Sequence, residues 1–286
     1  MATDQAALQP LSGLEDRDEP DALQTVIRSY AAAMATHEPG TRTGTDPEDL
    51  HKFRVATRRI RSLLRSTRSL VEDADESERI RAELKWLASL LGDVRDRDVL
   101  IEYLLGESET LDGAPLGAIL ELLDEERQEA QQALLAGLDS PRYAAVVADL
   151  RSPTALRKGK TLDEAARKEY RRLAKTMGGL GRNPEDDELH EARIRVKRAR
   201  YAAEAADGSA RFVERAKQLQ DVLGEHQDAV VAEERVRELL ERVRGTGRTA
   251  FAAGRLVERQ GARRAAARDA WPRAWRRLRK TGDRAF

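Results

Sequence analysis

Cysteine is absent from the 286-residue sequence, which excludes disulfide bonds and thiolate metal sites. No run of 18 apolar residues occurs, and residues 1–20 have neither the basic nor the apolar region of an export signal. The 51 basic and 51 acidic side chains cancel, so no net charge attracts an anion to the molecule as a whole. We therefore expect a soluble, unexported, cytoplasmic protein without a membrane segment.

Aromatic residues are also scarce, at 4% of the sequence, whereas Ala, Leu, Arg and Glu are abundant. This composition favours helix, and no segment alternates convincingly with the period of a strand. We therefore expect an all-α protein. Residues 1–19 are polar, acidic and aperiodic, which predicts a flexible tail.

The charges that are present are segregated along the chain. Residues 51–68 hold seven Lys or Arg and no acid, whereas residues 72–78 and 121–129 each hold five acids. Residues 255–280 hold ten basic residues against two acids. Binding of a charged partner should therefore depend on the local potential.

A cationic helix is encoded twice. One copy reads HKFRVATRRIRSLLR from residue 51, and the other reads HEARIRVKRARYAAE from residue 190. Spacings of three and four residues put the cations of the first copy on one helix face, within an arc of about 80°. These are His51, Arg54, Arg58, Arg61 and Arg65, and the aligned residues of the second copy are His190, Arg193, Lys197 and Arg200. Arg59 and Arg198 also align, but they lie about 80° from the histidine direction and suit either ligand binding or structural salt bridges.

Small and apolar residues occupy the opposite side of each copy, as expected for a stripe that faces a hydrophobic core. They are Phe53, Ala56, Ile60, Leu63 and Leu64 in the first copy and Ala192, Val196, Ala199, Ala202 and Ala203 in the second. If both positive faces line one groove, their repulsion would be relieved by an extended polyanion. Arg and Lys together suit phosphate oxygens.

The helical pattern divides at Ser152 and Pro153. We expect one domain over residues 20–286, with a first half at 20–152 and a second half at 153–286. Each half should contain about four helices, which makes a pseudo-symmetric all-α domain.

Local signals predict where the helices begin and break. Asp46 and Asn183 precede prolines and should cap the two cationic helices. The first helix of the chain should stop before Pro39. We expect a kink at Gly224 and an interruption at Pro272.

The repeat continues beyond the cationic helix: Lys85 aligns with Lys217, Gly92 with Gly224, and Asp96 with Asp228. The pattern HxxRxxxRRxR, with Lys197 for one arginine in the second copy, followed each time by LGxxxD, resembles the CHAD domain, the conserved histidine α-helical domain. The resemblance covers nearly all of the chain from residue 12 onward. It implies two pseudo-symmetric four-helix bundles in one compact domain, with a central basic groove that binds inorganic polyphosphate. It also implies residence at polyphosphate granules, with other granule proteins as further partners.

The resemblance carries ligand binding to the histidines and cations of both helices and to the aligned lysines. Further positions come from helical phase before the second motif, with one weaker counterpart in the first half. The added residues are Lys85, Lys217, Lys168, Arg171, Lys175 and Arg28.

Some roles stay open. His51 and His190 suit either a bond to phosphate or a hydrogen bond to a neighbouring helix, whereas His37 and His226 have no aligned partner and are expected to be incidental. The repeated aspartates should orient an arginine or cap a helix. The repeated glycines should permit close helix approach or a kink.

We expect a binding protein and not an enzyme, because neither a P-loop nor an acidic cluster accompanies the cations. No metal or cofactor is expected, since no second ligand lies at suitable spacing beside either histidine. Nucleic-acid binding is the alternative, although only Tyr201 borders a cationic stripe as a stacking residue. A scaffold whose basic faces pair with the acid-rich helices is the third reading. Oligomeric state is not indicated.

Overall fold

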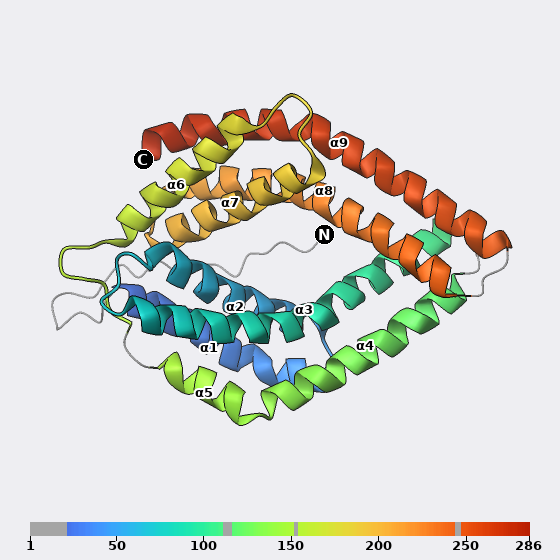
Figure 1. Ribbon diagram of the computed structural model, residues 1–286, viewed down its shortest axis with the longest axis horizontal. Helices are drawn as coiled ribbons and strands as arrows, with labels where there is room; N and C mark the ends of the chain where they lie inside the picture. Colours follow the sequence, from blue (N-terminus) through green and yellow to red (C-terminus); the bar gives the residue numbers. More distant parts are fainter. Residues whose placement is uncertain (1–21, 111–115, 152–153, 244–246) are drawn as a thin grey trace.

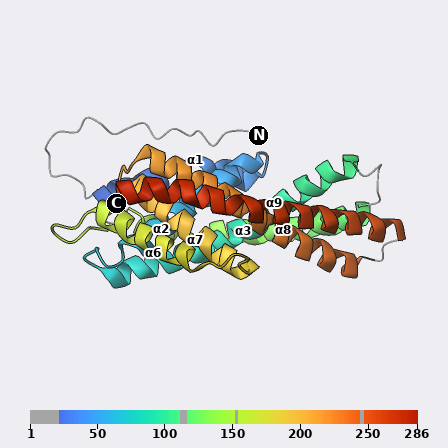
Figure 2. The ribbon, with the colours of Figure 1, turned by 90° about the horizontal axis from the view of Figure 1, so that it is seen from above.

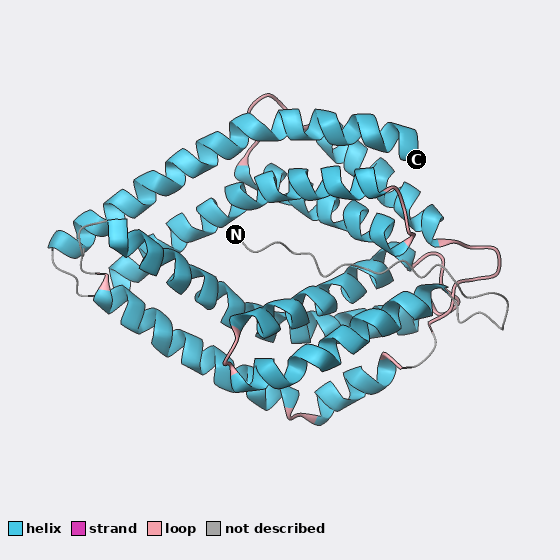
Figure 3. Ribbon diagram, turned by 180° about the vertical axis from the view of Figure 1, so that it is seen from behind, coloured by secondary structure: helices cyan, strands magenta, loops and turns pink. Residues whose placement is uncertain are grey.

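The computed structural model describes residues 22–110, 116–151, 154–243 and 247–286, and nine helices run through these ranges (Figure 1). The first half contains α1 (Ala22–Thr43), α2 (Pro47–Thr67), α3 (Ala74–Thr110), α4 (Gly117–Leu138) and α5 (Pro141–Asp149). The second half contains α6 (Leu162–Gly179), α7 (Asp186–Ala205), α8 (Ala210–Arg242) and α9 (Gly247–Ala285). Seen from behind, the described part of the chain is helix joined by short loops (Figure 3). The all-α prediction is confirmed, while the predicted tail and the predicted boundary at 152–153 lie outside the described residues.

The two cationic helices are α2 and α7, and each buries the stripe predicted for it. All ten residues of the two stripes are at most 3% exposed. Phe53 lies in a core of the first half and Ala192 in a separate core of the second half. A face that packs in this way fixes the rotation of its helix, so the cations on the other side must point out of the core.

The two halves meet at two places. The long helices α3 and α4 converge on α8 and α9 at one end of the molecule (Figure 1), where Leu104 and Ile119 share a third apolar cluster with Val236 and Leu256. Toward the other end, α2 packs against α7 and α6. Viewed from above, the helices spread along one long axis (Figure 2). The first half has one helix more than the second, because the short α5 follows α4.

Two predicted breaks and one predicted cap are wrong. Pro39 lies inside α1, where Arg42 beyond it binds Glu38 and the carbonyl of Leu138 and holds the last turn. Pro272 lies inside α9, where Trp271 and neighbouring apolar residues pack into the second core. In both helices tertiary contacts outweigh the one hydrogen bond that a proline removes.

The predicted cap of α2 is confirmed, since Asp46 Oδ1 accepts a hydrogen bond from the backbone N of Glu48 at 2.8 Å. At α7 the cap is Glu185 and not Asn183. The backbone N of Glu185 donates to Glu188 at 2.8 Å, and Arg268 binds the carbonyl of Pro184 just before it. Helix α8 passes through Gly224 without a break. No helix in the described ranges is both long enough and apolar enough to cross a membrane.

Candidate functional site

Cations from both halves come together where α2 packs on α7. We call Arg54, Arg58, Arg61, Arg193 and Lys197 the basic face. Burial lowers the pKa of Lys197 to about 7, together with the positive charges of Arg193, Arg58 and Arg54 and against the opposing effect of Asp228. Burial also lowers the pKa of Arg54; Asp96 opposes this, while Arg58, Arg95 and Arg193 add to it. The like charges of the two repeats are therefore within electrostatic reach of one another.

An arginine, an aspartate and a glycine form the same unit in each half. Arg54 Nη2 lies 3.2 Å from Asp96 Oδ1, and Arg193 Nη2 lies 3.5 Å from the aligned Asp228 Oδ1. The predicted pairing of the repeated aspartates with arginines is present in both copies. These pairs fix where each guanidinium lies above α3 or α8.

The glycine of each unit lies beneath the guanidinium. A Cβ added to Gly92 would lie 3.7 Å from Nε and Nη2 of Arg54, and a Cβ on Gly224 would lie 3.5 Å from Nη2 of Arg193. Each glycine thus makes room for an arginine side chain. This differs from the expected role, which was to permit a close approach of two helices or a kink.

Most of the basic face has no acidic partner. Among the described residues, no carboxylate forms an ion pair with Arg58, Arg61 or Lys197. The Nε atoms of Arg58, Arg61 and Arg193 are buried and have no hydrogen-bond partner among the described residues. A buried donor left unpaired costs about 1–3 kcal/mol. The guanidinium groups of Arg58 and Arg61 therefore carry charge that no ion pair within the described residues neutralises.

Arg200 does not belong to the basic face, contrary to the prediction. It is 5% exposed, and its Nε lies 3.3 Å from Glu204 Oε1 inside the contact between α2 and α7. Arg59 reaches the same carboxylate at 3.6 Å. The ring of Tyr201 lies among Arg58, Arg59 and Arg200, with centroid distances of 5.9, 5.8 and 4.9 Å. Arg59 and Arg200 therefore join the two halves, which settles Arg59 as a structural residue.

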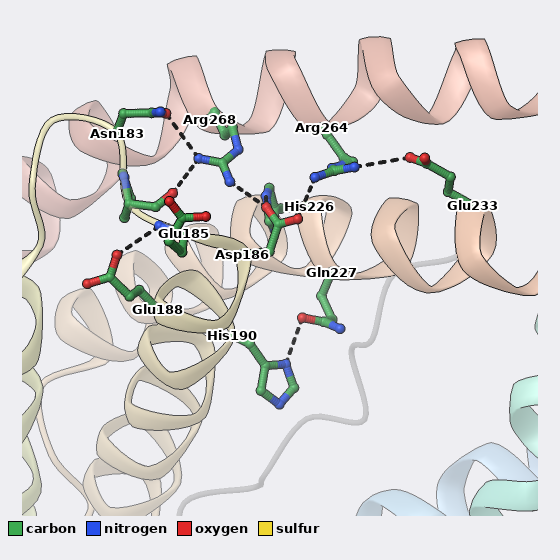
Figure 4. Close-up of polar contacts among 11 residues, drawn as sticks. Asn183, Glu185, Asp186, Glu188, His190, His226, Gln227, Glu233, Arg264 and Arg268 are labelled. Atoms are coloured by element: carbon green, nitrogen blue, oxygen red, sulfur yellow. Dashed lines mark hydrogen bonds and ion pairs between the residues drawn. The ribbon is translucent and has the colours of Figure 1, made fainter.

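The two motif histidines lie at the start of α2 and α7, and both are partly buried. His190 Nδ1 lies 2.7 Å from Gln227 Oε1 of α8 (Figure 4). Because the amide oxygen accepts, Nδ1 carries the hydrogen, and Nε2 is the nitrogen left for another partner. His190 thus contacts a neighbouring helix through Nδ1, and its Nε2 is the ring nitrogen that can contact a ligand.

The other two histidines are not incidental. His37 Nδ1 lies 2.7 Å from Asp49 Oδ1 and ties α1 to α2. His226 is 1% exposed, and its Nε2 lies 3.1 Å from Asp186 Oδ1. Asp186 also pairs with Arg264 and Arg268 of α9, so this cluster fastens the start of α7 to α8 and α9 (Figure 4). Sequence alignment could not find it, since neither histidine is repeated.

A groove of about 1300 Å³ continues from the end of α2 between α6 and α7, and we call it the α6 groove. Its cations are Arg65, Arg68, Arg157, Lys168, Arg172, Lys175 and Arg195, and its acids are Asp187, Glu188 and Glu191. Lys168 Nζ donates to Ser69 Oγ at 2.8 Å. Burial, together with the positive charges of Arg65 and Arg195, lowers the pKa of Arg198 to about 10, so Arg198 lies close to the groove.

The family model for the CHAD domain matches residues 25–237. The chain belongs to the CHAD domain family. Two curated relatives, the uncharacterized proteins MT2285 and Rv2226 from two strains of Mycobacterium tuberculosis, are each 34% identical to it over 230 residues. The match covers 74% of this chain and 44% of each relative, so the chain spans less than half of their length.

Two solved structures share the fold. PptA from Streptomyces chartreusis is 26% identical, with a TM-score of 0.77 over 90% of this chain and 100% of that one. The CHAD domain from the plant Ricinus communis is 24% identical, with a TM-score of 0.70 over 93% of this chain and 96% of that one. The predicted family and fold class are both confirmed.

The residues implied by the CHAD resemblance fall into separate places. Lys85 is exposed on the face of α3 that carries Gly92, because seven residues are close to two helical turns. Lys217 pairs with Asp221 at 3.3 Å on its own helix. Arg171 and Arg28 are exposed, and neither lines the α6 groove or belongs to the basic face.

Sequence reasoning missed four cations of the α6 groove: Arg68, Arg157, Arg172 and Arg195. Arg68 follows Arg65 by three residues, so a longer helical stripe would have included it. Arg157 lies between α5 and α6, where no periodicity points to it. The groove depends on a meeting of α2 and α6 that no local pattern encodes.

Proposed function

We propose that the protein binds inorganic polyphosphate along the basic face and the α6 groove, without catalysing a reaction. The observation that carries the proposal is that cations of both repeats meet at the basic face, where three of the five form no ion pair with a described carboxylate. Membership of the CHAD domain family supports the same ligand class.

The shape of the surface suits a chain of phosphates. From Arg54 to Arg65, the positive side of α2 extends over about 16 Å, since a helix rises about 1.5 Å per residue. Arg65 lies in the α6 groove, so the basic face leads into it. Each guanidinium offers forked donors to phosphate oxygens, and neighbouring cations repel one another less when a polyanion lies between them.

The acid-rich segments do not neutralise this surface. Glu76 and Glu78 pair with Arg79 and Arg81 on their own helix. Glu126 of α4 pairs with Arg235 and Arg242 of α8, beside the apolar cluster that joins the halves. A scaffold in which the basic faces pair with the acidic helices is therefore disfavoured.

A nucleic-acid ligand is also disfavoured. Tyr201, the aromatic residue next to a cationic stripe, is 3% exposed and covered by arginines, so bases have no access to its ring. Catalysis is disfavoured because Asp96 and Asp228, the repeated carboxylates of the site, are each engaged by an arginine.

Titration with long-chain polyphosphate tests the proposal. Arg58→Ala combined with Lys197→Ala removes two aligned cations that have no described carboxylate partner. We expect at least about a tenfold loss of affinity at moderate salt, because hydrogen bonds to charged groups contribute about 1.5–3 kcal/mol each. The matched control is Arg237→Ala with Arg248→Ala, two exposed positions outside the site, and we expect little change there.

Equal losses in both double variants, or no binding by the native protein, would disprove the proposal. Single-stranded RNA should compete poorly at equal phosphate concentration. Incubation with polyphosphate and Mg²⁺ should leave the chain length unchanged on a gel. Association with polyphosphate granules follows from binding, and a fluorescent fusion should lose granule localisation in the Arg58/Lys197 variant.

A further inference from the structure

A second cavity rich in cations lies where α8 begins and α9 ends. It measures about 380 Å³ and is separate in its residues from the basic face and the α6 groove. Arg211, Arg215, Arg277, Lys280 and Arg284 line it, and its lining includes no acidic side chain. Three of these cations belong to α9, whose basic residues the proposed function does not use.

The cations of α9 form a continuous row. Arg273, Arg277, Lys280 and Arg284 follow one another at spacings of four, three and four residues, so they share one face over about 16 Å. All four are exposed. Trp271, Trp275 and Leu278 are buried on the other side of the helix, and α9 lies along the outer edge of the second half (Figure 1). The row therefore faces away from the core.

Complementing the dipole of α9 explains only part of this arrangement. Cations near the C-terminal end of a helix are favourable, which suits Arg277 to Arg284. Arg211 and Arg215, however, lie in the first two turns of α8, at the positive end of its dipole, and that first turn has no acid. Two groups of cations thus face each other where the dipole of α8 adds to the positive potential.

Nearby acids are engaged elsewhere. Asp283 accepts a hydrogen bond from the hydroxyl of Tyr170, and Glu214 accepts one from Gln218 at 2.7 Å. Within the described ranges, no carboxylate forms an ion pair with any of the five cations of the cavity. Arg215 donates to the neutral side chain of Gln218, at 2.7 Å.

We infer that this cavity is a second binding site for a linear phosphate polyanion. One molecule then holds two chains, or two segments of one chain, at once. The choice of polyphosphate rests on the proposed function, but the site itself rests on its own cations. Two sites with separate linings make the protein a bridge between chains, and bridging raises avidity without any new contact at the first site.

The experiment uses the full chain and sodium tripolyphosphate, a short probe of three phosphates. Isothermal titration should give two tripolyphosphates per native molecule. Arg277→Gln, Lys280→Gln and Arg284→Gln together should reduce this to one, with the remaining affinity unchanged. Because these side chains are exposed, the variant should keep the native helical circular dichroism and melting temperature.

The Arg58→Ala/Lys197→Ala variant separates this inference from the proposed function. Its second cavity should bind tripolyphosphate with native affinity, while binding at the basic face weakens at least about tenfold. With long-chain polyphosphate, the native protein should form light-scattering assemblies, and both multiple variants should scatter less light at the same concentration.

Unchanged stoichiometry in the Arg277/Lys280/Arg284 variant would overturn the second site and leave the proposed function standing. If the Arg277/Lys280/Arg284 variant loses binding and the Arg58/Lys197 variant binds as the native protein does, the second site is supported and the first is removed. Binding of anionic vesicles or RNA at this cavity in preference to tripolyphosphate would overturn the inference.

Discussion

Affinity for polyphosphate should depend on pH through one lysine. Lys197 has a pKa of about 7, well below the ordinary value of lysine, because it is buried beside Arg193, Arg58 and Arg54. About half of the free molecules therefore carry a neutral Lys197 at pH 7. Phosphate oxygens favour the charged form, so binding should draw a proton onto this amine.

The size of the effect follows from the two protonation states. With a pKa near 7, roughly one free molecule in thirty has a charged Lys197 at pH 8.5. If the complex requires the charged form, affinity falls about fifteenfold between pH 7 and pH 8.5. At pH 7 about half a proton should be taken up per binding event, and less at pH 6, where the lysine is already charged.

Calorimetric titrations in buffers of different ionisation enthalpy count these protons directly. Lys197→Arg supplies the matched control, because a guanidinium stays charged over this range. The variant should bind with a flatter profile above pH 7 and with little proton uptake there. The arginine variant retains His51 and His190, so neither histidine can account for a difference between this variant and the native protein. A native pH profile and native proton uptake in Lys197→Arg would refute the reasoning.

Three further predictions concern stability, the role of a carboxylate and salt. Glu204→Ala should lower the free energy of unfolding by about 3 kcal/mol, since it leaves the buried Arg200 unpaired; a urea-denaturation difference below about 0.5 kcal/mol would contradict the structural role. Asp228→Asn should strengthen polyphosphate binding about two- to fivefold, because it removes a negative charge that competes for Arg193; weaker binding would mean that orienting the guanidinium matters more. The logarithm of affinity should fall with the logarithm of salt with a slope of about −3 to −4 for the five cations of the basic face. Arg58→Ala/Lys197→Ala should reduce that slope by about 1 to 1.5, and an unchanged slope would exclude these two cations from the contact.

The helices and their buried faces could be predicted because both depend on local pattern. The stripe around Phe53 and Ile60 has helical period, and burying it was the way to stabilise α2. The alignment of Arg54 with Arg193 and of Asp96 with Asp228 also foretold their pairing, since a repeated pair of residues must find each other twice.

Tertiary contacts decided what the pattern could not. Arg200 has the same place in its repeat as Arg61, yet Glu204 four residues later turns it inward, whereas Arg65 in the corresponding place repels Arg61. Pro272 should break a helix in isolation, but packing of Trp275 beyond it keeps α9 continuous. Arg157 enters the α6 groove from a loop. None of these outcomes is visible without knowing which helix lies opposite.

Arg200 departs from the symmetry of the two repeats for a physical reason. If Arg200 stayed on the surface as Arg61 does, six cations would meet at the contact of α2 and α7. Glu204 would then pair with Arg59 alone. Turning Arg200 toward Glu204 gives that carboxylate two ion pairs and places two guanidinium groups near the ring of Tyr201. The contact that results holds the halves together by paired charges. The unpaired charges stay at its edge, where the repulsion that lowers the pKa of Lys197 can be relieved by a polyanion.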